Sequence, residues 1–185
     1  WKTENAGTTY TPIFDGQGSN SIGCVTLDPN NPNVVWVGTG ENNNQRSVAY
    51  GDGLYMSEDG GSSWKHMGLK ESEHIGKVIV DPRDSRTVYV AAIGPLWSEG
   101  GDRGVYKTTD GGANWSSGQV SYGTAFSQVY GIDANTAYIA AYGTGTGNKI
   151  IKTTNRGLTW EPILSGAGAS SFFNVVHFFD ENNGF

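Results

Sequence analysis

The sequence predicts an all-β fold, and three observations support this prediction. Of the 185 residues, 28 are Gly and 12% are aromatic, which is typical of many short strands joined by tight turns. Apolar and polar residues alternate along many short runs, whereas few stretches show the 3.6-residue apolar spacing of a helix. The third observation is an eight-residue pattern that returns four times along the chain.

The repeated pattern, called a box below, has a fixed order of residue types. It starts with a hydroxyl residue, has Asp or Asn at its third position and Gly at its fifth, and ends with Ser, Thr or Asn followed by an aromatic residue. The boxes start at residues 3, 57, 108 and 153, so their starts lie 54, 51 and 45 residues apart. Repeats of this length are typical of propeller blades. Boxes 1 to 4 are TENAGTTY, SEDGGSSW, TTDGGANW and TTNRGLTW.

Short strand-like segments surround each box in a constant order. An apolar segment ending in Asp comes first (strand A, as in IGKVIVDP), followed by a second apolar segment (strand B, as in TVYVAAIG). A third segment runs into the box (strand C, as in GVYKT), and a fourth follows its aromatic residue (strand D, as in WEPIL). Four antiparallel strands in each repeat are the blade of a β-propeller. The prediction is therefore an all-β chain of four-stranded antiparallel blades, joined within each blade by box turns.

The repeats predict about three complete blades and two partial ones. We expect the end of a blade at 1–20, complete blades at 21–70, 71–120 and 121–166, and the start of another at 167–185. Since a partial propeller leaves sheet edges uncovered, a segment of a longer protein is favoured over a small ring closed by the two terminal pieces. The amino-acid composition also changes near Trp115. This change is consistent either with sequence divergence from blade to blade or with a junction of two homologous propeller regions.

The box is predicted to be a structural turn. An Asp or Asn side chain can accept hydrogen bonds from nearby backbone N–H groups, Gly can adopt the positive φ of a tight turn, and the aromatic residue can pack between blades. Two boxes carry Asn at the acid position, which a metal ligand or catalytic carboxylate would not tolerate. The predicted structural residues are Asn5, Gly7, Tyr10, Asp59, Gly61, Trp64, Asp110, Gly112, Trp115, Asn155, Gly157 and Trp160.

Composition argues against several classes of function. The net charge is −6 with a sequence pI near 4.9, and Lys and Arg form no cluster, so we expect no nucleic-acid partner. No apolar run reaches the length of a membrane span. The single cysteine, Cys24, is interpreted as a buried inert thiol, and the three histidines, His66, His74 and His177, are scattered without metal-ligand spacing. We therefore expect neither a metal nor a cofactor.

The four boxes resemble Asp-boxes, also called BNR repeats, of sialidases, sortilin-type receptor domains, xyloglucan-cleaving glycosidases and a photosystem assembly factor. The stretch from SIGCVTLDP to TTDGGANW especially resembles large exported bacterial proteins described as sortilin-like or glycosyl-hydrolase-like. The part from FSQVYGID onward is similar to repeats of secreted cell-surface proteins of Bacteroidetes-type bacteria. This resemblance implies bacterial export to an extracellular or cell-surface location.

In propellers of this type the box lies on the face opposite the usual binding face, so the resemblance directs attention to the B–C and D–A loops. The loop at 41–52 is rich in polar residues that suit a sugar or a peptide, and Trp97 in the loop at 94–103 could stack on a sugar ring or anchor a protein. Solvated loops without a ligand are the alternative. The predicted ligand-binding residues are Glu41, Asn43, Arg46, Tyr50, Trp97 and Arg103.

The sequence supports a catalytic function less well than a binding function. The sialidase resemblance implies three arginines on a substrate carboxylate, but Arg83 and Arg86 fall in an A–B turn and Arg156 falls inside a box, both on the wrong face. Hydrolysis of a glycoside generally needs two carboxyl groups across a cleft. Glu41 and Asp102 are weak candidates for such a pair, because nothing in their local sequence distinguishes catalysis from ordinary ion pairing.

Three hypotheses for function follow from these observations. The leading one is a non-catalytic binding or scaffolding propeller whose partner is another protein or a surface polysaccharide, completed by the remaining blades of a longer chain. The alternative is part of a glycoside hydrolase whose cleft includes the loops at 41–52 and 94–103. A third is a truncated or artificial repeat protein without a ligand of its own.

Overall fold

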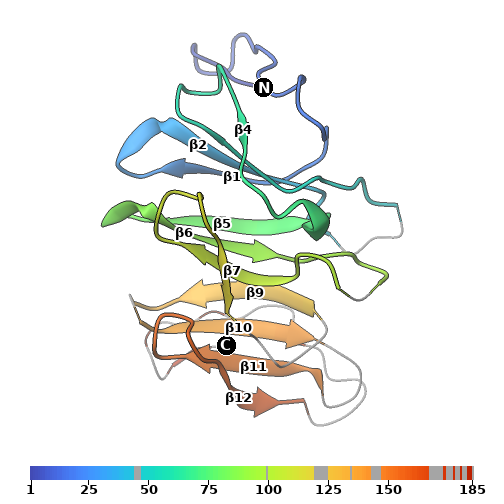
Figure 1. Cartoon of the computed structure of the whole chain (residues 1–185), viewed down its shortest axis with the longest axis vertical. Helices are drawn as coiled ribbons and strands as arrows, with labels where there is room; N and C mark the ends of the chain where they lie inside the picture. Colours follow the sequence, from blue (N-terminus) through green and yellow to red (C-terminus); the bar gives the residue numbers. More distant parts are fainter. Residues whose placement is uncertain are drawn as a thin grey trace.

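Three antiparallel sheets stack along the long axis of the molecule in the computed structural model (Figure 1). The structure describes residues 1–43, 47–98, 100–118, 125–133, 135–142 and 147–166, together with 173, 177, 180, 183 and 184. For 118, 125–128 and 142 only the backbone is described. A short 3₁₀ turn, η1 (Lys70–Ser72), lies between the first two sheets in the chain.

Each sheet contains four strands that are hydrogen-bonded in chain order, as expected for a propeller blade. The predicted all-β fold with four-stranded blades is confirmed, whereas the exact residue boundaries of the blades stay a prediction. Blade 1 consists of β1 (Ile22–Asp28), β2 (Asn31–Thr39), β3 (Leu54–Ser57) and β4 (Lys65–His66). Blade 2 consists of β5 (Ile75–Asp81), β6 (Asp84–Ala92), β7 (Gly104–Thr108) and β8 (Ser116–Gly118). Blade 3 consists of β9 (Ala125–Gly131), β10 (Ala137–Tyr142), β11 (Lys149–Thr153) and β12 (Glu161–Ser165).

The main hydrophobic core lies between blades 1 and 2. Trp36 and Leu54 of blade 1 are buried against Val78 and Val88 of blade 2. Gly38 is required at this interface, because a Cβ there would lie 2.4 Å from a side-chain carbon of Ile75. One hydrogen bond also crosses it, from the Thr26 hydroxyl to the Val78 carbonyl at 2.8 Å. These contacts hold strands β1 and β2 against strand β5.

Two smaller clusters lie in blade 3, one on each side of its sheet. Ile139, Ile151 and Trp160 are buried together, and Val105 of blade 2 packs against them. On the other side, Tyr138 and Ala140 are almost completely buried in a cluster that includes Phe173. Blade 3 is therefore covered by blade 2 on one side and by residues that follow it in the chain on the other.

All four boxes close their turns in the same way. The first hydroxyl accepts a hydrogen bond from the N–H of the fifth residue at 2.8–3.0 Å, and Oδ1 of the third residue accepts one from the N–H of the seventh at 2.8–2.9 Å. The fourth and fifth residues both have positive φ, which suits Gly60 and Gly111 but is also adopted by Ala6 and Arg156. In boxes 2 and 3 the N–H of the fourth residue donates to the B strand of the same blade at 2.8 and 2.9 Å, and in box 4 it donates at 3.0 Å to the carbonyl of Asn135, two residues before strand β10 begins.

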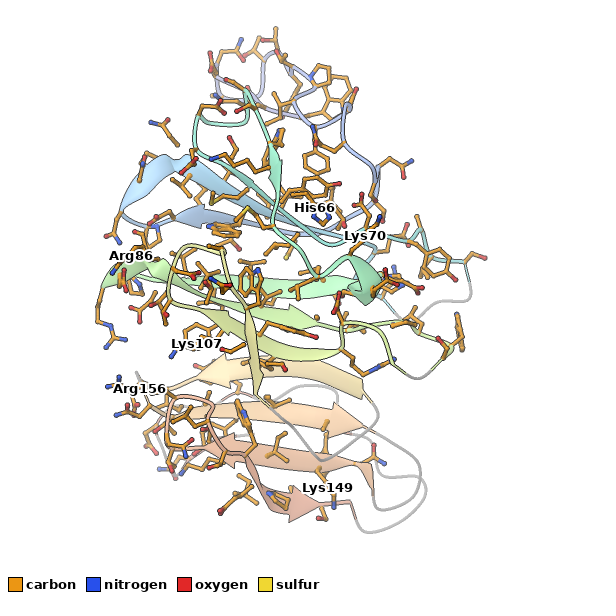
Figure 2. The ribbon with its side chains drawn as sticks, in the orientation of Figure 1. His66, Lys70, Arg86, Lys107, Lys149 and Arg156 are labelled. Atoms are coloured by element: carbon orange, nitrogen blue, oxygen red, sulfur yellow. The ribbon has the colours of Figure 1, made fainter. Side chains whose placement is uncertain are left out.

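The box turns and the B–C loops lie at opposite ends of the strands, because an antiparallel meander sends alternate connections to opposite edges. Figure 1 shows the turns of boxes 3 and 4 on the left and the B–C loops of blades 1 and 2 on the right. Figure 2 places Arg86 and Arg156 on the left, with the boxes, and Lys70 on the right, near the loops. The arginines labelled there are thus remote from the loops.

Candidate functional site

The candidate site is the loop face, formed by the described residues of the B–C loop of blade 1 (40–43 and 47–53), the D–A connection at 67–74 and the described residues of the B–C loop of blade 2 (93–98 and 100–103). Backbone hydrogen bonds join these three segments. The Gly51 N–H donates to the Glu73 carbonyl at 2.7 Å, and the Ile93 N–H donates to the His74 carbonyl at 2.8 Å. The loops of two neighbouring blades are therefore held by the connection between the blades.

Glu41 begins the first loop and is held mainly through its backbone. Its N–H donates to the Ala49 carbonyl at 3.1 Å, and its carboxylate accepts a hydrogen bond from the Asn43 side-chain amide at 3.2 Å. These two predicted residues thus contact each other. Arg46, a third predicted residue of this loop, lies outside the described residues.

Two aromatic side chains of the loop face are exposed. Tyr50 is 55% exposed, and its ring centroid lies 5.5 Å from that of the buried His74. Its backbone is anchored because the Ser19 hydroxyl donates to the Tyr50 carbonyl at 3.1 Å. Trp97, in the second loop, is 67% exposed. Each loop therefore presents a large aromatic side chain to solvent.

Asp102 and Arg103 organise the second loop. Asp102 Oδ2 accepts a hydrogen bond from the Glu71 N–H at 2.9 Å, while the Asp102 N–H donates to the Glu71 carbonyl at 3.3 Å. The Arg103 guanidinium donates to the carbonyl of Pro95 and to that of Ser98, the latter at 3.0 Å. Both side chains thus shape the loop that carries Trp97.

His74 is a central residue of this face, and no local pattern in the sequence indicated its role. Its side chain is fully buried, and Nδ1 donates to the Glu41 carbonyl at 3.0 Å, since a carbonyl can only accept. The His74 carbonyl in turn accepts a hydrogen bond from the Ser72 hydroxyl at 2.7 Å. Burial lowers the pKa of the imidazole below its usual value. The neutral ring therefore joins the D–A connection to the first loop.

A second polar cluster lies where the first loop returns to β3. The Tyr55 hydroxyl donates to Asp52 Oδ2 at 2.6 Å, and the His66 ring contacts the Asp52 carbonyl through Nε2 at 2.6 Å. Burial, followed by the hydrogen bond to Asp52, raises the pKa of Tyr55 to about 12. Tyr55 is therefore protonated near neutral pH and is poorly suited to act as a nucleophile.

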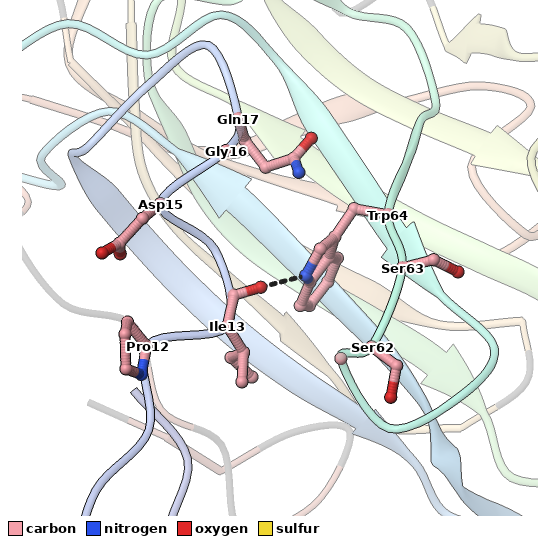
Figure 3. Close-up of a pocket in the computed structure, with 9 residues that line it drawn as sticks. Pro12, Ile13, Asp15, Gly16, Gln17, Ser62, Ser63 and Trp64 are labelled. Carbon is pink, nitrogen blue, oxygen red and sulfur yellow. Dashed lines mark hydrogen bonds between the residues drawn. The ribbon is translucent and has the colours of Figure 1, made fainter.

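A hollow of about 400 Å³ lies away from the loop face, between the N-terminal segment and box 2. It is open to solvent and lined by Pro12, Asp15, Gln17 and Trp64, among others. Figure 3 shows the Trp64 indole N–H directed at the Ile13 carbonyl, to which it donates at 2.6 Å. The hollow thus marks the joint between the N-terminal segment and blade 1.

No three His, Cys, Asp or Glu side chains come together as a metal site within the described residues. No helix in the described part of the chain is long and apolar enough to span a membrane.

The sequence matches one family model and a curated relative. The model, described as Sortilin-Vps10 (sortilin, neurotensin receptor 3), matches residues 52–183. The relative is a probable oligoxyloglucan-reducing end-specific xyloglucanase from Neosartorya fischeri, 32% identical over 120 residues. This match covers 60% of the present chain but only 12% of the xyloglucanase. The chain thus corresponds to a small part of that relative.

Solved structures with the same fold include propeller enzymes and a propeller that binds a peptide. The GH74 enzyme of Niastella koreensis matches with a TM-score of 0.64 and 22% identity, over 87% of this chain and 25% of the enzyme. YCF48 from Cyanidioschyzon merolae matches with a TM-score of 0.53 and 19% identity, over 81% of this chain and 42% of that one. A structure of YCF48 bound to D1 peptide matches at 0.51 and 14% identity, over 79% and 40% of the two chains. These similarities show the fold of the chain.

Proposed function

This chain belongs to the Sortilin-Vps10 family, and on that premise we propose that it is a non-catalytic binding or scaffolding module. The partner, a protein or a polysaccharide, docks on the loop face formed by the B–C and D–A loops. The protein acts after export, outside the cell or at its surface, as the resemblance to exported bacterial proteins suggests.

The observation that carries this proposal is the pair of exposed aromatic side chains on anchored loops. Tyr50 and Trp97 are 55% and 67% exposed, although the backbone around each is tied down by hydrogen bonds. An exposed aromatic ring on a rigid loop loses little conformational entropy on binding and can stack on a sugar ring or fill a pocket of a protein. The stability of the fold does not by itself explain why these two aromatic rings are exposed to solvent.

The contacts of the two candidate carboxylates also favour binding over catalysis. Asp102 receives a backbone N–H from Glu71, and Glu41 receives the Asn43 amide. In these contacts the carboxylates orient the loops. A hydrolase would need one such group positioned as an acid and a second as a base or nucleophile.

The known relatives support both kinds of partner. One is named a xyloglucanase, which acts on a polysaccharide, and another propeller was solved with a bound peptide. By analogy, the loop face of the present chain takes an extended polymer, either a polysaccharide or a peptide.

Binding to arrays of plant and bacterial glycans and of peptides tests the proposal. We expect Trp97→Ala to weaken binding about tenfold or more, as expected for an exposed aromatic anchor, and Tyr50→Ala to weaken it less. Trp1→Ala is the matched control, because Trp1 is a tryptophan of similar exposure, 75%, outside the loop face. Equal effects of Trp97→Ala and Trp1→Ala, or retained binding in Trp97→Ala, would contradict the proposal.

The second candidate function is a glycoside hydrolase whose cleft includes the loops at 41–52 and 94–103. The xyloglucanase match favours it, since that relative shares 32% identity over 120 residues. Turnover of xyloglucan oligosaccharides that disappears in both Glu41→Gln and Asp102→Asn would establish this function. Binding that survives both substitutions, without turnover in the parent protein, would support the binding module.

A further inference from the structure

The buried ring of His74 is hydrogen-bonded at one of its two nitrogens. Nδ1 donates to the Glu41 carbonyl at 3.0 Å, which fixes the single proton of the neutral ring on this nitrogen. Nε2 is also buried and has no hydrogen-bond partner among the described residues. Because both nitrogens of a protonated imidazole are donors, a second proton would leave a charged N–H group buried without an acceptor. The site therefore suits only the neutral ring.

Three segments pack around His74, and two of them carry charged groups that act on it. Glu41 of the first loop and Glu73 of the D–A connection both favour the protonated ring through their negative charges. The ring centroid of Tyr50 lies 5.5 Å away, and the second loop contributes the Ile93 N–H, which donates to the His74 carbonyl at 2.8 Å. Burial outweighs the two carboxylates and lowers the pKa of the imidazole.

The first loop and the D–A connection leave little space between them. A Cβ at Gly40 would lie 2.8 Å from the Cα of His74 and would also collide with the Glu73 carbonyl. The Gly51 N–H donates to the same carbonyl at 2.7 Å. Because the two backbones are already in contact, a charged ring could reach water only if these contacts opened. Such an opening would displace Tyr50, the residue before Gly51 and one of the two exposed aromatic residues of the loop face.

We propose that His74 is a positioning residue of the loop face and that its protonation releases the first loop from the D–A connection. The loop face is therefore assembled near neutral pH and loses affinity for its partner in mildly acidic surroundings. The release of the loop depends only on the contacts above, whereas the loss of affinity rests on the binding function proposed for the loop face.

Acid should favour the open loop. A ring whose pKa is lower in the closed form than in the open form takes up protons when the loop opens. The closed form is therefore stable above pH 6.5, the ordinary pKa of an imidazole, and loses stability as the pH falls below that value. The opening equilibrium increases by up to about tenfold for each pH unit. Ordinary carboxyl groups titrate about two pH units lower, so the range between about pH 5 and 7 reports on histidine.

Hydrogen exchange of the Gly51 amide measures this opening, since its N–H ties the first loop to the D–A connection. The exchange is expressed as a protection factor, which corrects for the pH dependence of the exchange chemistry itself. In the parent chain we expect the Gly51 protection factor to fall about tenfold between about pH 7 and pH 5.

His74→Asn is the test variant, because an Asn amide can donate to the Glu41 carbonyl as Nδ1 does but does not titrate. We expect its Gly51 protection factor to stay constant over this range. His66→Asn is the matched control, since this exposed histidine contacts the Asp52 carbonyl through Nε2 at 2.6 Å, at the other end of the first loop. The control should keep the pH dependence of the parent chain.

Three results would overturn the release of the loop. One is the same pH dependence of Gly51 protection in the parent chain and in His74→Asn. Another is a pH dependence that disappears in His66→Asn instead. The third is an NMR titration of the His74 ring in the parent chain without a change in Gly51 protection, a result that needs no variant and applies even if His74→Asn does not fold.

The affinity for a glycan or peptide that binds the loop face is measured over the same pH range. Because hydrogen exchange needs no partner, it tests the release of the loop even where the proposed binding function fails. A loss of affinity at about pH 5 in the parent chain, but not in His74→Asn, would support the control of binding by His74. Release of the loop with an affinity that does not change with pH would overturn that control.

Discussion

Boxes 2 and 3, which carry Asp, differ from boxes 1 and 4, which carry Asn, in the side-chain hydrogen bond between the third and the seventh residue. In all four, the first hydroxyl and Oδ1 of the third residue accept the same backbone N–H groups. In the Asp boxes, Oδ2 of Asp59 accepts from the Ser63 hydroxyl at 2.6 Å. In the Asn boxes the direction reverses, and the Asn155 amide donates to the Thr159 hydroxyl at 2.7 Å.

This difference shows which part of the box is general. The turn needs a hydroxyl, one side-chain oxygen and a backbone that can reach positive φ, whereas a negative charge is optional. The seventh residue adapts to either choice, since a Ser or Thr hydroxyl both donates and accepts and an Asn amide can donate to Asp110. A group whose charge can be dispensed with in this way is structural, so the site of function must be sought elsewhere.

Substituting valine for the Gly at the fifth box position should have the largest effect on stability. The loss should be greater in box 2 than in box 4. A Cβ on Gly61 would lie 2.5 Å from the Ile13 side chain at φ +92°, whereas on Gly157 the nearest atom is 3.7 Å away at φ +81°. We expect Gly61→Val to lower the free energy of unfolding by about 3 kcal/mol and Gly157→Val by about 1–2 kcal/mol. Urea denaturation followed by tryptophan fluorescence measures both. Equal losses would mean that backbone strain alone limits this position.

Removing the first hydroxyl should have a smaller effect, in Asp and Asn boxes alike. Thr108→Val and Thr153→Val keep the side-chain shape but leave the Gly112 and Gly157 N–H groups without their acceptors. We expect each variant to lose about 1 kcal/mol of unfolding free energy, at the lower end of the usual result of leaving a shielded donor unpaired. Ser62→Ala is the control, because that hydroxyl is exposed and donates to the Asp59 carbonyl at 3.1 Å without accepting a backbone N–H of the turn within the described residues. A neutral Thr153→Val would show that the Asn boxes close in some other way.

Removing the negative charge at the third box position should have the smallest effect on stability, and this effect should be confined to acid pH. Hydrogen bonds, led by that from Ser63, lower the pKa of Asp59 to about 2, and those led by Thr108 do the same for Asp110. Because the pKa values are lower in the folded chain, this stabilisation is present above the ordinary carboxyl pKa of 3.8 and is lost as the pH falls toward 2.

The double variant Asp59→Asn/Asp110→Asn should therefore match the parent protein near neutral pH and lose less stability between pH 4 and 2, the window between these pKa values. Denaturation midpoints measured across this range test the expectation. Part of the acid sensitivity should remain, because Arg83 also lowers the pKa of Asp81 to about 2. A large loss of stability in the double variant at neutral pH would contradict an optional charge.

The blade structure was predictable because it depends on local, repeated interactions. A hydroxyl two residues before an Asp or Asn, and a Gly two residues after it, can close the turn within eight residues, and the segments around it alternate with the period of a strand. The positive φ at Ala6 and Arg156 was not predictable, because neither residue type favours it and only the surrounding turn enforces it.

The sequence by itself determined the fold class, the order of strands and the position of each box turn, since all of these follow from neighbours along the chain. Only the tertiary structure decided that His74 is buried against Glu41 and that Asp102 contacts Glu71. It also decided that Ile22, Val25 and Leu27 of strand β1 are exposed, whereas the equivalent residues of strand β5 in blade 2 are buried, although the two strands have similar sequences. Burial depends on which blade lies opposite, and that partner comes from a distant part of the chain.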